Sequence, residues 1–138
     1  MKSQIRNFMI TAGAAAILTV PALTAQTALE KAEVPFDFTV GAKTMTAGNY
    51  SVSTISNRAV ILLHNEDTKE SMILGSTIRG DEKNKSVLAF RCYGDRCFLS
   101  EIDVPGTPSY ILKQDRLENQ AAKTNGQATM AFVTMASR

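Results

Sequence analysis

The chain has 138 residues, of which 44% are hydrophobic and 20% are charged, and its formal net charge is +2. Lys2 and Arg6 account for this excess, so the rest of the chain carries equal numbers of basic and acidic residues. A neutral, mixed surface argues against nucleic-acid binding, which needs a positively charged face. No block of like charges suggests an interaction tail.

Residues 1–25 have the pattern of a cleaved secretory signal peptide, with a basic start and an apolar run over Phe8–Val20. Small residues fit cleavage after either Ala22 or Ala25, and the choice between them is open. An uncleaved membrane anchor is the alternative, because the uncharged run is nearly long enough to span a bilayer. Pro21 and the alanine content favour cleavage. We therefore expect an exported protein, periplasmic or secreted, with no stable membrane span after cleavage.

What remains after the leader is about 113 residues, the size of one domain. The charged segment 26–33 is expected to be a mobile spacer, and the β domain is expected over residues 34–112. Its first strand, Val34–Val40, alternates apolar and polar residues and so has one buried face. Pro35 lacks a donor N–H, which predicts that this strand lies at a sheet edge or starts late.

Further strands follow between turn signals. Gly41 and Ala42 predict a turn, and the segment Tyr50–Ile55 predicts a strand with alternate residues buried. Ala59–His64 is continuously apolar, as expected of a strand buried on both faces. The pattern extends to another strand over Ser71–Ile78. The charged segment Gly80–Lys85 is expected to be flexible.

The stretch Val87–Val104 has the pattern of a tight β-hairpin, with two β-prone arms around Gly94 and Asp95. Glycine accepts a positive φ without a Cβ clash, which suits the first central position of a type II′ turn. This turn predicts the register: Tyr93 closes the turn opposite Arg96, and the preceding pairs follow from it.

The register places Cys92 opposite Cys97 in a non-hydrogen-bonded pair, where side chains come close enough for a disulfide. The alternative is two free thiols packed as small apolar residues. Oxidation needs an oxidising compartment, so the predicted export favours the disulfide. The four-residue gap between the cysteines does not match the Cys-x-x-Cys redox motif.

The period of the pattern changes after Pro108. Residues 113–138 are expected to form a short surface helix over Lys113–Lys123, which ends at Thr124–Gly126. A strand-like segment, Ala128–Met135, then either pairs as a last strand or stays free. The predicted fold class is mostly β, a small antiparallel β-sandwich or barrel of about seven or eight strands with a possible short C-terminal surface helix.

Three segments in this order, Val34–Gly41, Ala47–Val52 and Phe90–Ser100, resemble small exported proteins of unassigned function from acidobacteria and similar soil bacteria. The resemblance covers most of the chain after the leader and becomes weaker past Pro108. It implies a location in the bacterial envelope or outside the cell. It brings no catalytic or binding residues with it, and it implies that the cysteine positions often hold other residues.

The hairpin also carries the candidate binding surface, formed by Arg91, Tyr93, Arg96 and Phe98. Rings and guanidinium groups side by side can recognise a ligand. The alternative is local cation–π packing across the strands, which recurs on sheets without any ligand.

No catalytic constellation is found. His64 is the only histidine, and no serine lies in a nucleophile-elbow context. With Cys92 and Cys97 it supplies at most three ligands, fewer than a structural zinc site needs. The acids in turns, such as Glu66 and Asp67, are expected to be solvated. We expect no cofactor and no metal.

The predicted function is that of a non-enzymatic binding or structural module of the bacterial envelope or exterior. A protein or envelope partner is compatible with this reading, and the sequence identifies none. Two alternatives remain open: a small hydrolase that uses His64, and an assembly subunit that pairs through exposed strand edges.

Overall fold

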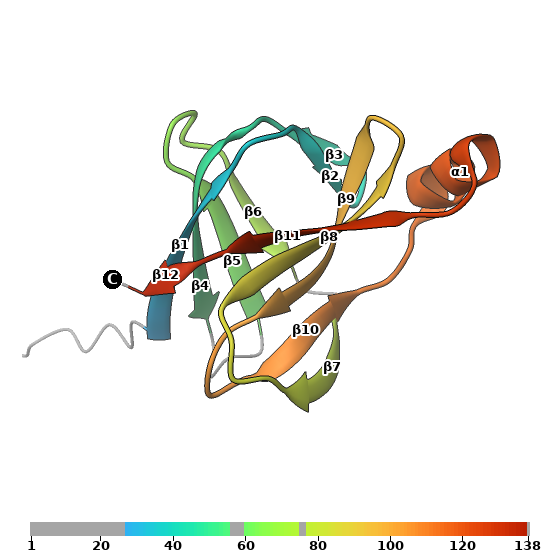
Figure 1. Ribbon diagram of the computed structural model, residues 1–138. Helices are drawn as coiled ribbons and strands as arrows, with labels where there is room; N and C mark the ends of the chain where they lie inside the picture. The colour runs from blue at the N-terminus through green and yellow to red at the C-terminus, as the bar shows by residue number, and fades with distance from the viewer. Residues whose placement is uncertain (1–26, 56–59, 75–76, 138) are drawn as a thin grey trace, which may run out of the picture.

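The structure is a computed structural model that describes residues 27–55, 60–74 and 77–137. In this part of the chain two β-sheets enclose one core, and one short helix lies at one end (Figure 1). The predicted mostly β fold class is confirmed, as two sheets rather than a closed barrel. The described residues form twelve strands, more than expected. The predicted signal peptide, residues 1–25, lies outside them.

The first sheet has five strands in the order β12-β1-β4-β5-β6, and all neighbours run antiparallel. In that order the strands span Ala136–Ser137, Thr27–Val34, Gly48–Ile55, Val60–Asn65 and Ser71–Leu74.

The expectation of a mobile spacer over residues 26–33 is wrong for residues 27–33, and residue 26 lies outside the described part of the chain. Thr27–Val34 forms β1, which lies between β4 and β12 in the sheet. The charged residues suggested a spacer, but they alternate with apolar residues along a strand. Ala32 and Val34 are buried in the core, whereas Glu33 is exposed. Glu30 also lies on the buried side, where two serine hydroxyls donate hydrogen bonds to its carboxylate. The β domain therefore begins before residue 34.

The second sheet has seven strands, with the main order β11-β8-β9-β10-β7. β10 pairs with only part of one edge of β9, and β2 pairs with another part of that strand. β2 runs parallel to β9 and also pairs with β3. The strands span Phe38–Val40 (β2), Lys43–Met45 (β3), Thr77–Glu82 (β7), Val87–Tyr93 (β8), Arg96–Asp103 (β9), Pro108–Leu112 (β10) and Thr129–Thr134 (β11).

The predicted strand Val34–Val40 is divided between the two sheets. Its first residue ends β1, and only Phe38–Val40 continues as β2, so the late start predicted from Pro35 is confirmed. Proline has no N–H to donate to a ladder, and this is where the chain leaves the first sheet for the second. The Asp37 carboxylate accepts a hydrogen bond from the Ala47 N–H at 2.8 Å and so holds the crossing against the next turn.

Two predictions, one about burial of a strand and one about a flexible segment, need correction. The apolar run in β5 is buried on one face only, because Ile61 and Leu63 are fully covered while Leu62 and His64 are half-buried. The second concerns Gly80–Lys85, which was expected to be flexible. Its first residues belong to β7, which pairs with β10.

Three rings join the sheets in the core. Phe38 makes edge-to-face contacts with Tyr50 of the first sheet and with Phe90 of the second, at centroid distances of 5.1 and 5.2 Å. All three side chains are completely or almost completely buried. Edge-to-face pairs of this kind add to the gain from burial itself.

The predicted C-terminal surface helix is confirmed as α1, Arg116–Asn125, which starts three residues later than expected. Asp115 caps it, because its carboxylate accepts the Glu118 N–H at 2.9 Å. Gly126 ends it with φ 79°. Of the two alternatives for the tail, pairing as a last strand is confirmed, since β11 pairs with β8 over its whole length. In the described part of the chain this helix falls well short of the length and apolarity needed to cross a bilayer.

Candidate functional site

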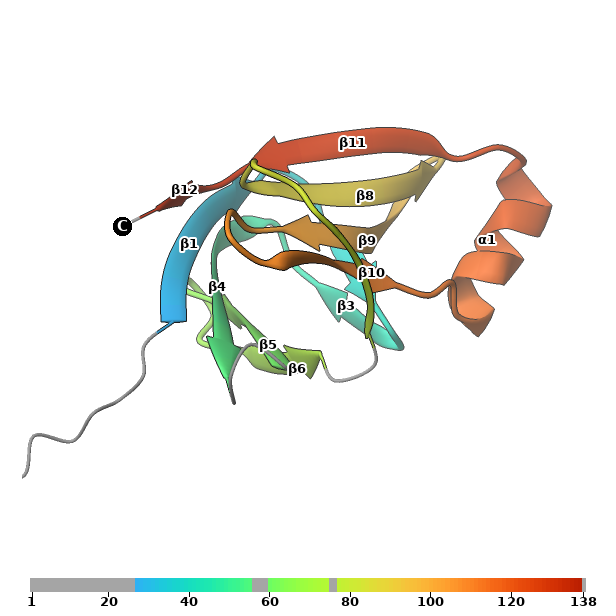
Figure 2. The same cartoon turned by 90° about the horizontal axis from the view of Figure 1, so that it is seen from below.

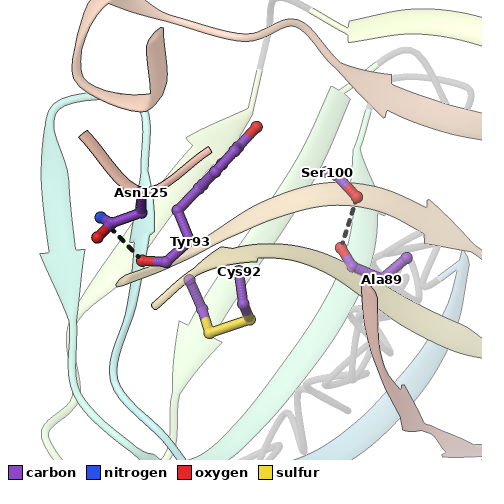
Figure 3. The surroundings of a disulfide bond; sticks show 6 residues. Ala89, Cys92, Tyr93, Ser100 and Asn125 are labelled. Carbon is purple, nitrogen blue, oxygen red and sulfur yellow. Dashed lines mark hydrogen bonds between the residues drawn. A yellow bond between two sulfur atoms is a disulfide. The ribbon is translucent and has the colours of Figure 1, made fainter. Parts of the chain in front are cut away.

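The β8–β9 hairpin has the predicted register. Tyr93 pairs with Arg96, and Cys92 pairs with Cys97. Gly94 has φ 62°, and Asp95 is not among the residues with positive φ, as a type II′ turn requires. The predicted disulfide is present between the paired cysteines, whose Cα atoms are 4.0 Å apart. Figure 3 shows the bridge across the hairpin, with Asn125 of α1 donating a hydrogen bond to the Tyr93 carbonyl.

Helix α1 covers one face of this hairpin. Tyr93 and Phe98 are each 2% exposed and pack with Ala121 in a small apolar cluster outside the main core. Figure 2 places the helix beside the turn end of the β8–β9 hairpin, away from the first sheet.

An ion pair holds the helix to the sheet. Glu118 is 2% exposed, and both of its carboxylate oxygens accept hydrogen bonds from the Arg91 guanidinium. The Tyr93 hydroxyl donates a third hydrogen bond to Glu118 at 3.1 Å. The hydrogen bonds to Glu118 raise the pKa of Arg91 above its usual value, and burial raises the pKa of Tyr93. The phenol therefore stays a donor at neutral pH.

The candidate binding surface on the hairpin is consequently not an open surface. Arg91, Tyr93 and Phe98 contact or lie beneath α1, and only Arg96 is exposed. The Arg96 guanidinium lies 5.4 Å from the centroid of Phe98, which is a local cation–π contact along β9 and not across the two strands. The sequence pattern did not reveal that a helix from the end of the chain would cover the rings.

An open cavity of about 140 Å³ remains near the turn of the hairpin, beside Arg96 and Cys97. Asp37 and Asp95 bring carboxylates to it, and Thr39 and Thr44 bring hydroxyls. A larger open groove of about 530 Å³ lies at the other end of the molecule, where β1 passes the end of β11. Its charged lining residues are Lys31, Glu33 and Glu66, and Lys31 and Glu66 form an ion pair at 3.6 Å.

A second ionic cluster, not predicted from the sequence, lies on the outer face of the second sheet. Glu101 and Asp103 lie two residues apart on β9, and the Ser109 hydroxyl of β10 donates a hydrogen bond to Asp103. Lys83 contacts Glu101 directly and lies 4.0 Å from Asp103. The alternation Glu-x-Asp around the apolar Ile102 was the available signal, because alternate strand residues share a face.

The two acids of this cluster titrate differently. Burial, together with the hydrogen bond to Glu101, raises the pKa of Asp103, although the Ser109 hydroxyl opposes this shift. Burial also acts against ionisation of Glu101, but hydrogen bonds to Lys83 and Asp103 bring its pKa below the usual value. The pKa values of the two neighbouring acids are therefore shifted in opposite directions.

His64 lies on the outer face of the first sheet. Its Nδ1 is 2.7 Å from the Ser71 hydroxyl on the neighbouring strand, and Ser51 is its partner on the other side. A hydrolase would also need an acid that orients the imidazole and a pocket for substrate. Neither of the two cavities described above is lined by His64. Among the residues that the structure describes, no group of three or more metal-ligating side chains comes together.

The most distinctive surface is the edge strand β11, Thr129–Thr134. It pairs with β8 on one side, and no other strand of the described chain pairs with its other side (Figure 2). Phe132 is 63% exposed and Met130 is 46% exposed, and both project from the outer face. Ala131 and Val133 project inward and pack on the core. The strand carries no charged residue.

Comparison of the chain with protein-family models, with curated proteins and with solved structures finds no match. The features described above are therefore the basis for any proposed function.

Proposed function

We propose that this chain is the precursor of an exported, non-enzymatic β domain of the bacterial envelope or exterior, and that it acts by pairing its edge strand β11 with another β-strand. The proposal makes it a binding or structural module. The resemblance to small exported bacterial proteins, noted on sequence motifs, supports the location.

The disulfide supports export. Cys92 and Cys97 are joined in the hairpin, and disulfides persist in oxidising compartments such as the periplasm and the exterior. The basic and apolar pattern of residues 1–25 is what an export signal requires.

The single observation that carries the function is the exposed, uncharged edge of β11. Strand edges present unpaired N–H and C=O groups, and proteins usually protect them with charge, proline or short length. The opposite end of the same sheet follows this rule, because β7 contains Arg79, Asp81 and Glu82. β11 is six residues long and has none of these protections. An unprotected edge is what recognition by strand addition uses.

Export is tested by expressing the full chain in a bacterium with two membranes and measuring the intact mass in each cell fraction, with and without reductant. We expect a chain cut after Ala22 or Ala25 in the periplasm or medium, two hydrogen masses lighter before reduction. Uncut chain in the cytoplasm, or two reduced thiols in exported material, would contradict the proposal.

The role of β11 is tested by chemical crosslinking of exported protein in cells. Products formed by the wild-type chain should be lost on Phe132→Lys, which adds a charge to β11, and retained on Ile73→Lys. Ile73 is the matched control because it is also exposed, at 64%, but lies on β6 at the far edge of the other sheet. Products that survive Phe132→Lys unchanged would show that the contact lies elsewhere.

The absence of enzymatic activity is tested against the hydrolase alternative. Purified protein and the His64→Ala variant are compared on generic ester, peptide and glycoside substrates. We expect neither to turn over substrate. Hydrolysis by the wild type that His64→Ala abolishes would replace the binding proposal with the enzymatic one.

A further inference from the structure

We propose that the strand which pairs with β11 is β11 of a second copy of this chain, antiparallel about a two-fold axis at Ala131. The inference rests on the proposed role of β11 as the contact edge and names its partner. Two sheets of seven strands would then join into one continuous sheet across the axis.

The direction of the backbone groups sets which residues face the free edge. The Met135 N–H donates a hydrogen bond to the Ser86 carbonyl at 2.9 Å, one step beyond the β11–β8 ladder. The ladder has no register shift, and in an antiparallel pair hydrogen-bonded residues alternate along the strand. Val133, Ala131 and Thr129 therefore bond to β8.

The N–H and C=O groups of Met130, Phe132 and Thr134 consequently point away from β8, toward the free edge. A two-fold axis at Ala131 places Met130 opposite Phe132 of the second copy, and the reverse. Both members of this pair direct their backbone groups at the partner, so the two equivalent pairs form closed hydrogen-bonded rings. Ala131 lies opposite Ala131 of the second copy in a non-hydrogen-bonded pair.

The side chains are compatible with this register. Directly opposite residues lie on the same face of a sheet. The exposed thioether of Met130 meets the exposed ring of Phe132, a favourable sulfur–aromatic contact, on both sides of the axis. With the axis at Ala131, Met135 lies outside the new ladder. The chain passes from the second sheet to the first at this residue.

The absence of charge makes β11 of a second copy a better partner for β11 than the other edge strands of the molecule. Identical copies repel when an edge carries charge, and β11 carries none. The edge strand β7 carries three charged residues, whereas β6 and β12 are only four and two residues long. An isologous contact about a two-fold axis also closes on itself and does not produce fibres.

The association is tested by sedimentation velocity on the processed, disulfide-bonded chain over a range of concentrations. We expect a dimer. Met130→Pro should be a folded monomer, because it removes an N–H that points to the free edge and leaves the bonds to β8 intact. Met130→Ala keeps that N–H and should still dimerise. Phe132→Lys should raise the dimer dissociation constant at least about tenfold, and Ile73→Lys should leave it unchanged.

The register is tested with single cysteines under mild oxidation. Ala131→Cys should give a covalent dimer that reductant separates, because the two residues face each other across the axis. Val133→Cys should not, since its partner is Thr129.

A wild-type chain that stays monomeric would overturn the second-copy inference and leave the proposed contact edge standing, provided that crosslinking in cells still depends on Phe132. A dimer unaffected by Phe132→Lys would overturn both. If Met130→Pro is unfolded by circular dichroism, Phe132→Lys and the cysteine variants decide the question.

Discussion

At the scale of single residues, two acids, one on α1 and one on β9, are buried in different ways. Glu118 and Asp103 are each 2% exposed. Glu118 receives a guanidinium with two hydrogen bonds, whereas Asp103 faces another carboxylate and a serine hydroxyl, with lysine ammonium groups at 3.9 and 4.0 Å. A charge is well compensated at the first position and poorly at the second, so their mutations should have different consequences.

The free energy of unfolding of Asp103→Asn, relative to that of the wild type, should increase as the pH rises. The folded-state pKa of Asp103 is raised above the usual 3.8 by burial and by Glu101. A raised pKa means that the stability linked to this group is complete below about 3.8 and is lost as the pH rises through the folded-state pKa. Asparagine still accepts the hydrogen bond from Ser109 and has no charge to bury. Urea unfolding of both proteins between about pH 3 and 7 measures the difference.

Glu101→Gln is the counterpart with the opposite sign. The pKa of Glu101 is lowered from 4.5, so its contribution is present above that value and is lost as the pH falls. The glutamine variant should therefore lose stability relative to the wild type as the pH rises. Two difference profiles with the same slope would contradict opposite pKa shifts for the two acids.

At the scale of elements, α1 depends on polar contacts to stay on the sheet. Only Ala121 is a fully buried apolar residue of the helix, and Leu117 and Ala122 are partly buried. An isolated helix of ten residues is marginal in water. The ion pair to Arg91, the Asp115 cap and the Asn125 amide therefore stabilise its docked position.

Glu118→Ala should destabilise the fold by about 3 kcal/mol, because it leaves the Arg91 guanidinium partly buried without its partner. Chemical unfolding measures the loss, and hydrogen exchange should show that α1 opens first. Glu118→Gln, which retains an acceptor for Tyr93, should cost less. The double variant Arg91→Met with Glu118→Leu should recover most of the loss, since no charge remains unpaired. A loss below about 0.5 kcal/mol for Glu118→Ala would mean that the pair behaves as an exposed one.

At the scale of the whole molecule, the two sheets are tied together at one corner by Glu30. The carboxylate is 3% exposed and accepts hydrogen bonds from Ser86, ahead of β8, at 2.8 Å and from Ser137 of β12 at 3.3 Å. The chain also crosses between the sheets here, at the buried Met135. Figure 1 shows β11, β12 and β1 meeting at this corner.

Glu30→Ala should reduce the free energy of unfolding by about 2 kcal/mol, because the half-buried Ser86 hydroxyl and the exposed Ser137 hydroxyl lose a charged acceptor. Since the residue joins the sheets, native-state hydrogen exchange should show lower protection in β4 and β8 alike. Glu30→Gln retains one of the two acceptor oxygens, so its free energy of unfolding should lie between those of the wild type and of Glu30→Ala. Loss of protection confined to β4 would contradict a joint between the sheets.

Local patterns predicted local structure well in this chain. The hairpin register and the disulfide followed from Gly94 and the spacing of two cysteines, because a two-residue turn allows only one pairing nearby. The helix end at Gly126 followed from the same kind of rule. β1 was misread, because a strand that turns a glutamate inward has the composition of a spacer. The candidate binding surface was expected to be open, because no local pattern near residue 93 predicts that a helix beginning at Arg116 covers it.

The sequence by itself therefore determined the β class, the turns, the cysteine pairing and the expectation of export, since each depends on residues that are neighbours along the chain. Only the tertiary structure decided that α1 covers Tyr93 and Phe98, that Glu30 is buried between the sheets, and that β11 is the unprotected edge. The physical reason is that burial and sheet order depend on which distant segments pack together. An alternating stripe such as Met130 and Phe132 does not itself say which of its two faces the core will cover.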